Sequence, residues 1–298
     1  MKKILAVLIA VVMLVSMSSF AMAEEPMKIG YLLSDLSNQF FTTLEAGIKA
    51  HCEELGIEVV GYDSGNDAAN DMTNMEDLLS VGVDLILYNP VDSDAGEAVV
   101  ALANEQGVPV ITVDRGVNGG EVVSHIASDN VYGAEIAAQY IVELLGEEGG
   151  AVAEVQGMSG ASAATDRHTG FDNVMSAAEN ITVVSSQVGN WDRTQAMTIM
   201  ENVLTSNPEV KAVFCANDVM ALGVVEACQA AGRDDIIIVG FDADSDAIDA
   251  INEGTMAGTI QQLPDEMGKT AVDVAVSYLK GETVEANIGV EVALVKAE

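Results

Sequence analysis

The chain has 298 residues, and 47 Asp and Glu against 12 Lys and Arg give it a formal net charge of −35 at pH 7. So acidic a surface repels nucleic-acid phosphates and anionic lipid headgroups, which makes both poor partners. Hydrophobic residues make up 49% of the sequence, which excludes an intrinsically disordered acidic chain and indicates a well-formed core.

The first 23 residues have the pattern of an export signal. Two lysines precede an apolar run at 4–15, and the small-residue sequence AMA, which ends at Ala23, is typical of a cleavage site. The apolar run is too short for a membrane span, which needs ~20 residues. We therefore expect cleavage after Ala23 and export of a soluble protein that is not embedded in a membrane.

After the export signal, short apolar runs alternate with amphipathic helical stretches. The strand candidates lie at 27–33, 57–62, 83–88, 108–113, 122–127, 151–156, 181–188, 210–215, 235–240 and 256–260. Continuous apolar strands separated by helices indicate parallel sheets that are covered on both faces. So many strands exceed one compact sheet, and the pattern therefore predicts two α/β domains with doubly wound parallel sheets.

The helix expected after the first strand begins with two adjacent phenylalanines. Phe41 starts a stripe of apolar residues at helical spacing, which continues at Leu44, Ile48, Cys52 and Leu55. Membership of this stripe explains Phe41 as a core residue. Phe40 lies off the stripe, so a packing role does not account for it.

The two series of strands echo each other. In the first series one strand ends at Asn89 and the next at Asp114, and in the second the corresponding residues are Asn217 and Asp242. Each Asn precedes its Asp by 25 residues. Ligands of open α/β sheets bind beyond the carboxyl ends of strands, so two facing domains would place these four side chains around one cleft.

Other polar and aromatic residues are expected at the same strand ends. The polar ones are Asn38, Asn89, Asp114, Arg115, Arg167, Asn217, Asp242 and Gln262, and the aromatic ones are Phe40, Phe41, Trp191 and Phe241. Carboxylate and amide oxygens accept hydrogen bonds from hydroxyls, whereas Arg and amide nitrogens donate to them. This mixture is complementary to a neutral polyhydroxylated ring, which is a sugar. Helix capping is the alternative role for each Asn and Asp, and burial in the core is the alternative for Trp191 and Phe41.

Two further patterns are weak matches to other functions. The stretch from Asp242 to Glu253 has carboxylates at calcium-loop positions, but Ala247 stands where the loop requires Gly. The sequence GMSGA at 157–161 is similar to a hydrolase nucleophile elbow, but Ala161 replaces its last Gly. We expect neither a metal site nor a catalytic serine, and no cofactor.

Several longer stretches give a specific resemblance. They are NQFF (38–41), NPVDSDA (89–95), VDRG (113–116), EVVSHIASDN (121–130), QGMSGASAATDR (156–167), NWDR (190–193), ANDVMALG (216–223), VGFD (239–242) and QQLPD (261–265). Through them the mature chain closely resembles, over its whole length, the periplasmic sugar-binding proteins of bacterial ABC importers, and among these the ribose-binding type. The resemblance implies the type I periplasmic binding protein fold, two Rossmann-like domains joined by a multi-strand hinge.

The resemblance also implies a ligand set. The residues that would hydrogen-bond the sugar hydroxyls are Asn38, Asp114, Arg115, Arg167, Asn217, Asp242 and Gln262. Phe40, Phe41 and Phe241 would press on the sugar ring, with Trp191 where the ribose type has Phe, and Phe40 would thereby be half of an aromatic clamp. Asn89 and Ser128 would act behind this set or near the hinge. Gln39, where the ribose type has Pro, is a second departure, so ribose or a related pentose or hexose is expected.

The implied organisation has one domain at 24–128 plus 263–291 and another at 129–262 plus 292–298, with the hinge near Ser128, Gln262 and the C-terminal stretch. The implied function is non-enzymatic: a periplasmic, monomeric protein closes on a monosaccharide and delivers it to an ABC permease, with a chemoreceptor as a further partner.

Two alternatives to this function stay open at the level of the sequence. One is a sugar sensor for a chemoreceptor or a two-component system without transport. The other is a sugar-active enzyme that uses Asp114 and Asp242 as a carboxylate pair. Against the enzyme, Arg115 and Arg167 are expected to keep both carboxylates ionised, which would leave no acid with a raised pKa.

Overall fold

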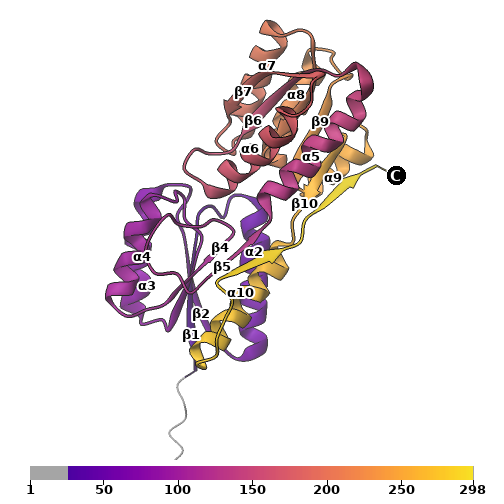
Figure 1. Ribbon diagram of the computed structural model, residues 1–298. Helices are drawn as coiled ribbons and strands as arrows, with labels where there is room; N and C mark the ends of the chain where they lie inside the picture. The colour runs from indigo at the N-terminus through magenta and orange to yellow at the C-terminus, as the bar shows by residue number, and fades with distance from the viewer. Residues whose placement is uncertain (1–25, 298) are drawn as a thin grey trace, which may run out of the picture.

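The computed structural model describes residues 26–297, so the expected export signal at 1–23 and its cleavage site lie outside the described residues. Within that range the chain forms two six-stranded sheets, each with helices on both faces (Figure 1). We call each sheet with its helices a lobe. The prediction of two parallel α/β units is confirmed.

The first sheet has the strand order β11-β5-β4-β3-β1-β2, and all its pairings are parallel. Its strands are β1 (Lys28–Leu33), β2 (Glu58–Asp63), β3 (Leu85–Tyr88), β4 (Val110–Val113), β5 (Ser124–Ser128) and β11 (Asn287–Val290). The strands β1, β3 and β4 are buried almost throughout, as a sheet covered on both faces requires.

The second sheet has the strand order β12-β10-β9-β8-β6-β7. Its strands are β6 (Gly150–Gln156), β7 (Ile181–Val188), β8 (Val210–Cys215), β9 (Ile237–Asp242), β10 (Gly258–Gln261) and β12 (Ala293–Lys296). Its pairings are parallel except at one edge, where β12 pairs antiparallel with β10. The chain runs directly from β11 in the first sheet to β12 in the second. Along this path β12 enters the second sheet in the direction opposite to that of β10.

Helices cover both faces of each sheet. In the first lobe they are α2 (Gln39–Leu55), α3 (Ala68–Val81), α4 (Ala95–Glu105) and α10 (Pro264–Leu279). In the second lobe they are α5 (Asn130–Leu145), α6 (Ser162–Met175), α7 (Arg193–Ser206), α8 (Asp218–Ala230) and α9 (Ser245–Asn252), with the short 3-10 helix η1 (Gly146–Glu148). Each sheet therefore lies between two separate apolar clusters, with α2 and α10 on one face of the first sheet and α3 and α4 on the other.

The helical stripe predicted in α2 is confirmed except at its end. Phe41, Leu44, Ile48 and Cys52 are at most 3% exposed, whereas Leu55 is 48% exposed because the helix ends there at the left-handed Gly56. Phe40, which lies off the stripe, is also buried, at 5% exposed. It belongs to the same apolar cluster of the first lobe as Phe41.

The chain passes between the lobes at three places. It leaves the first sheet after β5 and enters α5, leaves the second sheet after β10 and enters α10, and passes from β11 to β12 (Figure 1). The C-terminal strands lie along both lobes as one continuous stretch in Figure 1. The three passages lie on the β5, β10 and C-terminal side of the molecule, which leaves the carboxyl ends of the other strands facing each other.

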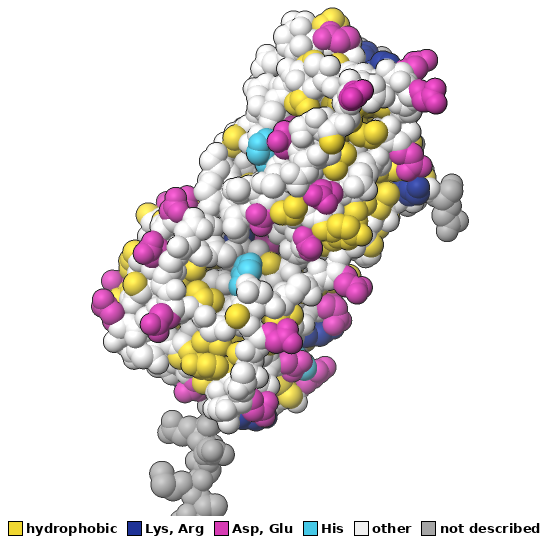
Figure 2. Space-filling view, viewed as in Figure 1, with side chains coloured by type: hydrophobic (Ala, Val, Ile, Leu, Met, Phe, Trp, Pro, Cys, Tyr) yellow, Lys and Arg dark blue, Asp and Glu magenta, His cyan; other side chains and the backbone are white. Residues whose placement is uncertain are grey.

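The surface agrees with the composition. Figure 2 shows Asp and Glu side chains spread over both lobes on the visible face, with few Lys and Arg among them. No helix within residues 26–297 is long and apolar enough to cross a membrane.

Candidate ligand-binding site

A cavity lies where the carboxyl ends of the two sets of strands meet. Its empty volume is about 280 Å³. It is lined by Asn38, Phe40, Phe41, Asp114, Arg115, Ala163, Arg167, Trp191, Asn217, Asp242 and Gln262. Both lobes contribute to its wall, which means that the cavity is complete only while they are closed on each other.

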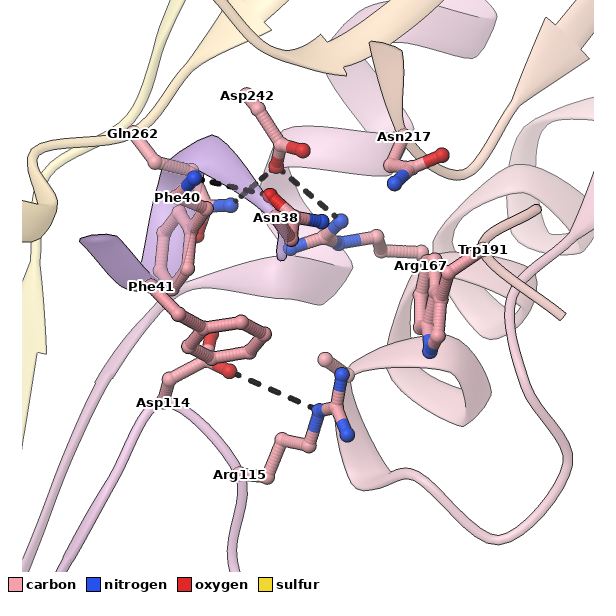
Figure 3. Close-up of a pocket in the computed structure, with 11 residues that line it drawn as sticks. Asn38, Phe40, Phe41, Asp114, Arg115, Arg167, Trp191, Asn217, Asp242 and Gln262 are labelled. Atoms are coloured by element: carbon pink, nitrogen blue, oxygen red, sulfur yellow. Dashed lines mark hydrogen bonds and ion pairs between the residues drawn. The ribbon is translucent and has the colours of Figure 1, made fainter. Parts of the chain in front are cut away.

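One wall of the cavity is a pair of phenylalanine rings at the first turn of α2. Phe40 and Phe41 contact each other edge to face, with ring centroids 5.1 Å apart and an interplanar angle of 89°. Asn38 caps this helix, because its side-chain oxygen accepts a hydrogen bond from the backbone N–H of Phe40 at 2.9 Å. The cap fixes the start of α2 and so holds both rings against the cavity (Figure 3).

Trp191 forms the opposite wall in Figure 3. Asn190 and Trp191 have φ angles of 54° and 61°, the left-handed region that side chains other than Gly rarely occupy. The indole lies on Gly157, where a Cβ would come within 2.0 Å of the ring. The indole Nε1 is buried and has no hydrogen-bond partner. A strained turn and a glycine platform thus hold this ring at the cavity.

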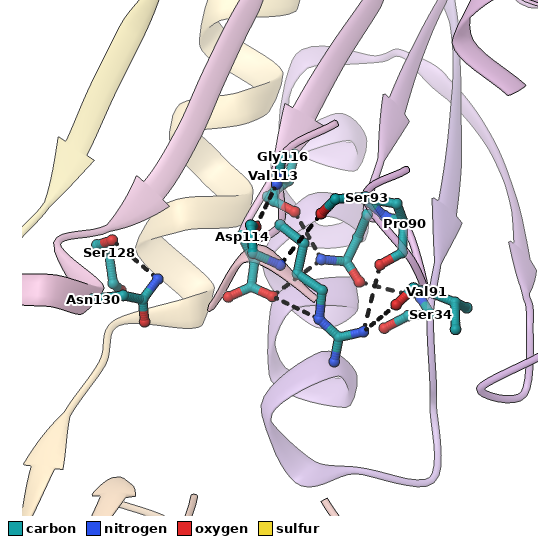
Figure 4. Close-up of polar contacts among 12 residues, drawn as sticks. Ser34, Pro90, Val91, Ser93, Val113, Asp114, Gly116, Ser128 and Asn130 are labelled. Atoms are coloured by element: carbon teal, nitrogen blue, oxygen red, sulfur yellow. Dashed lines mark hydrogen bonds and ion pairs between the residues drawn. The ribbon is translucent and has the colours of Figure 1, made fainter. Parts of the chain in front are cut away.

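In the first lobe, Asp114 and Arg115 follow β4. Asp114 has a φ of 62°, and its carboxylate accepts a hydrogen bond from Asn89 Nδ2 at 3.0 Å. Arg115 Nε lies 3.8 Å from the Asp114 carboxylate (Figure 3), and its Nη1 is 3.4 and 3.5 Å from the carbonyl oxygens of Pro90 and Val91, two residues labelled in Figure 4. These contacts are long, and Arg115 Nε forms no hydrogen bond. Burial lowers the pKa of Arg115, but the guanidinium stays charged and needs further acceptors.

In the second lobe, α6 carries Arg167 into the cavity. Its Nε donates to Asn130 Oδ1 at 2.8 Å and its Nη1 to the carbonyl oxygen of Ala216 at 2.6 Å. The guanidinium also lies 3.7 Å above the ring of Phe241, which is a cation–π contact. Arg167 Nη1 is 3.6 Å from Asp242 Oδ1. The protein therefore fixes this arginine before any ligand arrives.

Asp242 ends β9 with a φ of 128°, and its Oδ1 accepts a hydrogen bond from Gln262 Nε2 at 2.6 Å. We expected that pairing with Arg167 would leave this carboxyl group without a raised pKa, and that expectation is wrong. Burial outweighs the attraction of Arg167 and raises the pKa of Asp242 well above its ordinary value. The neighbouring Asp244 and Asp218 raise it further, and these charges could not be placed from the sequence.

Behind Asp242, the carboxylate of Asp218 holds the turn after β9. It accepts hydrogen bonds from the Thr259 hydroxyl at 2.7 Å and from the backbone N–H of Asp244 at 2.9 Å. The turn is strained, since Ala243 has a φ of 61°. Burial raises the pKa of Asp218 to about 7. Asp218 thus fixes the backbone on which Asp242 is carried.

Asn217 shows that helix capping and cavity lining are compatible. Its Oδ1 accepts a hydrogen bond from the backbone N–H of Met220 at 3.0 Å, which caps α8, and it also lines the cavity. Asn38 does the same for α2. The two roles that the sequence offered as alternatives are both present at these positions.

Ten of the thirteen predicted site residues line the cavity, and three lie behind it. Asn89 bonds to Asp114 and to the Val113 carbonyl, Phe241 lies beneath Arg167, and Ser128 is buried at the end of β5. The cavity also has one lining residue that we did not predict, Ala163 on α6. An alanine carries no chemical group that would have marked it in the sequence.

The calcium-loop pattern does not fold as a loop, because Ser245–Asn252 is the helix α9. Within residues 26–297 no group of three His, Cys, Asp or Glu could hold a metal ion.

Comparison with known proteins gives a consistent picture. Residues 29–283 match the family model described as a periplasmic binding protein domain. The ribose import binding protein RbsB of Escherichia coli K12 is 44% identical over 295 residues, which are 99% of this chain and 98% of that protein. RbsB of Bacillus subtilis 168 is 41% identical over 266 residues, 89% of this chain and 86% of that protein.

Solved structures show the same fold. An ABC transporter solute binding protein from Bacillus halodurans C-125 with bound myo-inositol superimposes with a TM-score of 0.86 at 30% identity, over 92% of this chain and 96% of that one.

Proposed function

The chain belongs to the periplasmic binding protein family, and on that premise we propose that it captures a monosaccharide between its lobes and delivers it to an ABC permease. Ribose or a related pentose or hexose is the expected ligand, since the two relatives described above are ribose import binding proteins. The protein would act as a monomer in the periplasm after cleavage behind Ala23.

The observation that carries this proposal is the composition of the cavity wall. Two phenylalanines and one tryptophan offer flat apolar faces, and between them lie two arginines, two aspartates, two asparagines and a glutamine. A pyranose or furanose ring has apolar C–H faces and a rim of hydroxyls, each able to donate and accept hydrogen bonds. The wall matches both surfaces of such a ring.

Each predicted site residue then has a role in the proposal. The hydroxyl partners are Asn38, Asp114, Arg115, Arg167, Asn217, Asp242 and Gln262. Phe40, Phe41 and Trp191 contact the faces of the ring. Asn89 and Phe241 act through Asp114 and Arg167, which they hold in place, and Ser128 acts at the hinge.

We further propose two domains that correspond to the lobes, at 24–128 plus 263–291 and at 129–262 plus 292–298. The hinge consists of the three passages between the lobes, near Ser128, Gln262 and residues 290–293. Because each lobe holds half of the polar groups, a sugar satisfies both halves only in the closed form. The closed form is then what the permease recognises.

We propose that the protein is not an enzyme. The raised pKa of Asp242 removes one argument against a glycosidase, but the cavity supplies another. A glycosidase has to hold groups on both sides of the bond that it cleaves, whereas the polar groups here line a single small cavity between the lobes. Release of a chromogenic leaving group from a nitrophenyl pentoside or hexoside would contradict this proposal.

The direct test is thermal melting of purified residues 24–298, unfolded and refolded to remove bound ligand, with a panel of sugars headed by D-ribose. At a concentration a thousandfold above Kd, a ligand adds ~4 kcal/mol to the folded state. We expect the melting midpoint to rise by several degrees with at least one pentose or hexose. An unchanged midpoint across the whole panel would refute monosaccharide binding.

A further inference from the structure

The two lobes also contact each other directly, beside the cavity. The backbone N–H of Ser93 donates to the carbonyl oxygen of Gly160 at 2.9 Å, and the N–H of Ser162 donates to Ser93 Oγ at 3.2 Å. The N–H of Gly116 donates to Ser162 Oγ at 2.9 Å. These three hydrogen bonds join two loops of the first lobe, the β3–α4 loop and the β4–β5 loop, to the start of α6 in the second lobe. We call them the lobe latch.

The latch supplies the missing cap of α6. The N-cap position of this helix is Ala161, whose side chain cannot accept a hydrogen bond, so the N–H groups of the first turn need an acceptor from elsewhere. Ser93 of the other lobe provides one, and its own side chain is buried at 3% exposed. The helix that carries Arg167 is therefore capped by the first lobe only when the lobes are closed.

The backbone of Gly160 is shaped for this contact. It has a φ of 91°, and a Cβ at this position would lie 2.0 Å from Asp92 Oδ2. Asp92 cannot easily move away, since its Oδ1 accepts hydrogen bonds from the backbone N–H groups of Asp94 and Ala95 at 2.9 and 2.8 Å. Only glycine allows the two loops to approach this closely.

The opposite flank of the cavity has a weaker contact. There the Ser245 hydroxyl donates to Gln39 Oε1 at 3.3 Å, and both side chains lie at the surface. One exposed hydrogen bond competes with water and contributes little. The stronger direct hydrogen bonds between the lobes are therefore those of the latch. The latch lies next to Arg115 and at the start of α6, the helix that carries Arg167.

We propose that the lobe latch stabilises the closed form independently of the sugar, so that Ser93, Gly160 and Ser162 are positioning residues that set affinity without selecting the ligand. The inference rests on the proposed function in one respect, that closure captures a monosaccharide. The latch hydrogen bonds involve no side chain that lines the cavity. Their contribution is the same for every ligand over which the lobes close.

The first test uses Ser93→Ala and Ser162→Ala, with Kd measured by calorimetry for D-ribose and for a second sugar that raises the melting midpoint. Each variant loses one hydrogen bond of the closed form, so we expect about threefold to tenfold weaker binding, by the same factor for both sugars. Ser245→Ala is the matched control, and its Kd should change less than twofold by the same reasoning. The melting midpoint without sugar should stay close to that of the wild type. A larger loss for one sugar than for the other would overturn the inference, as would an unchanged Kd in both variants.

A second test needs no ligand and separates this inference from the proposed function. Small-angle X-ray scattering without sugar should give a larger radius of gyration for the Ser93→Ala/Ser162→Ala double variant than for the wild type, because a latch that acts independently of the sugar also favours the closed form when no sugar is bound. Gly160→Ala, which cannot close fully, should give at least as large a radius. Equal radii for the wild type and both variants would overturn the latch, even if the protein binds sugar. Absence of binding to any sugar of the panel, together with a radius difference, would overturn the proposed function alone.

Discussion

The two halves of the cavity share a sequence pattern but are connected differently. In each half an Asn precedes an Asp by 25 residues, and both aspartates have positive φ angles, 62° at Asp114 and 128° at Asp242. In the first half, Asn89 lies behind the cavity and holds Asp114 by a hydrogen bond. In the second, Asn217 faces the cavity and caps α8, and Gln262 bonds to the aspartate instead. A repeated pattern therefore fixes where residues lie without fixing what each one contacts.

The two arginines differ most. Arg167 makes hydrogen bonds of 2.6 and 2.8 Å and lies on an aromatic ring, whereas the contacts of Arg115 with its lobe are 3.4–3.8 Å long. The second half is preorganised, and the first half has an arginine that still needs acceptors. We infer that Arg167 fixes where the sugar lies, and that Arg115 adapts to the sugar once the lobes close.

The largest effect is expected from Arg167→Ala. Removing this side chain leaves Asn130 Oδ1, the Ala216 carbonyl oxygen and the sugar hydroxyls without this donor in a closed cavity, which should weaken binding by ~2–5 kcal/mol. Titration calorimetry with the best sugar of the panel measures the loss. Arg193→Ala is the control, because Arg193 pairs with Glu226 at the surface and should leave Kd unchanged. Wild-type affinity in Arg167→Ala would refute the assignment of the site.

A smaller loss is expected from Arg115→Ala. This guanidinium has no short contact with the protein, so its removal leaves fewer protein groups without a hydrogen-bond partner. We therefore expect binding to weaken by about 1–2 kcal/mol. Calorimetry under the same conditions measures it. If Arg115→Ala weakened binding more than Arg167→Ala, the contrast between a fixed and an adaptable half would be wrong.

The sequence predicted the fold and most of the cavity wall, and its failures have physical causes. Strand and helix order follows from runs of apolar residues, but β11 and β12 are edge strands of only four residues with no buried side chain, too short to stand out. The unusual backbone at Trp191 is held by contact with Gly157, which is distant in sequence. The pKa of Asp242 depends on burial and on Asp244 and Asp218 as well as on Arg167. Reasoning from the Arg167–Asp242 pair alone therefore predicted the wrong direction for the pKa shift.

The third prediction compares the buried carboxylates behind the two halves, Asp71 in the first and Asp218 in the second. Asp71 accepts hydrogen bonds from Ser64, Tyr88 and the backbone of Val91. Burial raises the pKa of both, that of Asp218 from 3.8 to about 7. A raised pKa means that the folded state binds the proton more tightly than the unfolded state. The contribution of these two groups to the free energy of unfolding therefore falls as pH rises from about 4 to about 7.

In Asp218→Asn this decline should be smaller by about 2 kcal/mol between pH 4.5 and pH 7.5, since no proton is released from the site. Urea denaturation at the two pH values measures it. Asp71→Asn is the matched variant and should reduce the pH dependence of the free energy of unfolding less. A carboxylate that accepts three hydrogen bonds resists protonation better. An Asp218→Asn curve parallel to that of the wild type would show that this group does not titrate in the range.

The smallest effect on overall affinity is expected from Trp191→Phe, which also tests the contact between the halves. The indole lies 5.7 Å from the guanidinium groups of both arginines, so it is shared by the fixed and the adaptable half. Phenylalanine keeps an aromatic face but removes the buried Nε1, which has no partner in the protein. We expect affinity for the best sugar to change by less than about 1 kcal/mol.

The ranking of the sugars should nevertheless change, because Trp191→Phe enlarges the cavity on one side only. Pentoses, which are smaller, should gain relative to hexoses in the melting panel if the indole sets the outline of the cavity. The chain contains a single Trp, so a fluorescence change on adding sugar to the wild type reports directly on this wall and should be absent in the variant. An unchanged ranking with a retained fold would show that the polar groups alone select the sugar, and that Trp191 serves only to close the cavity between the two arginines.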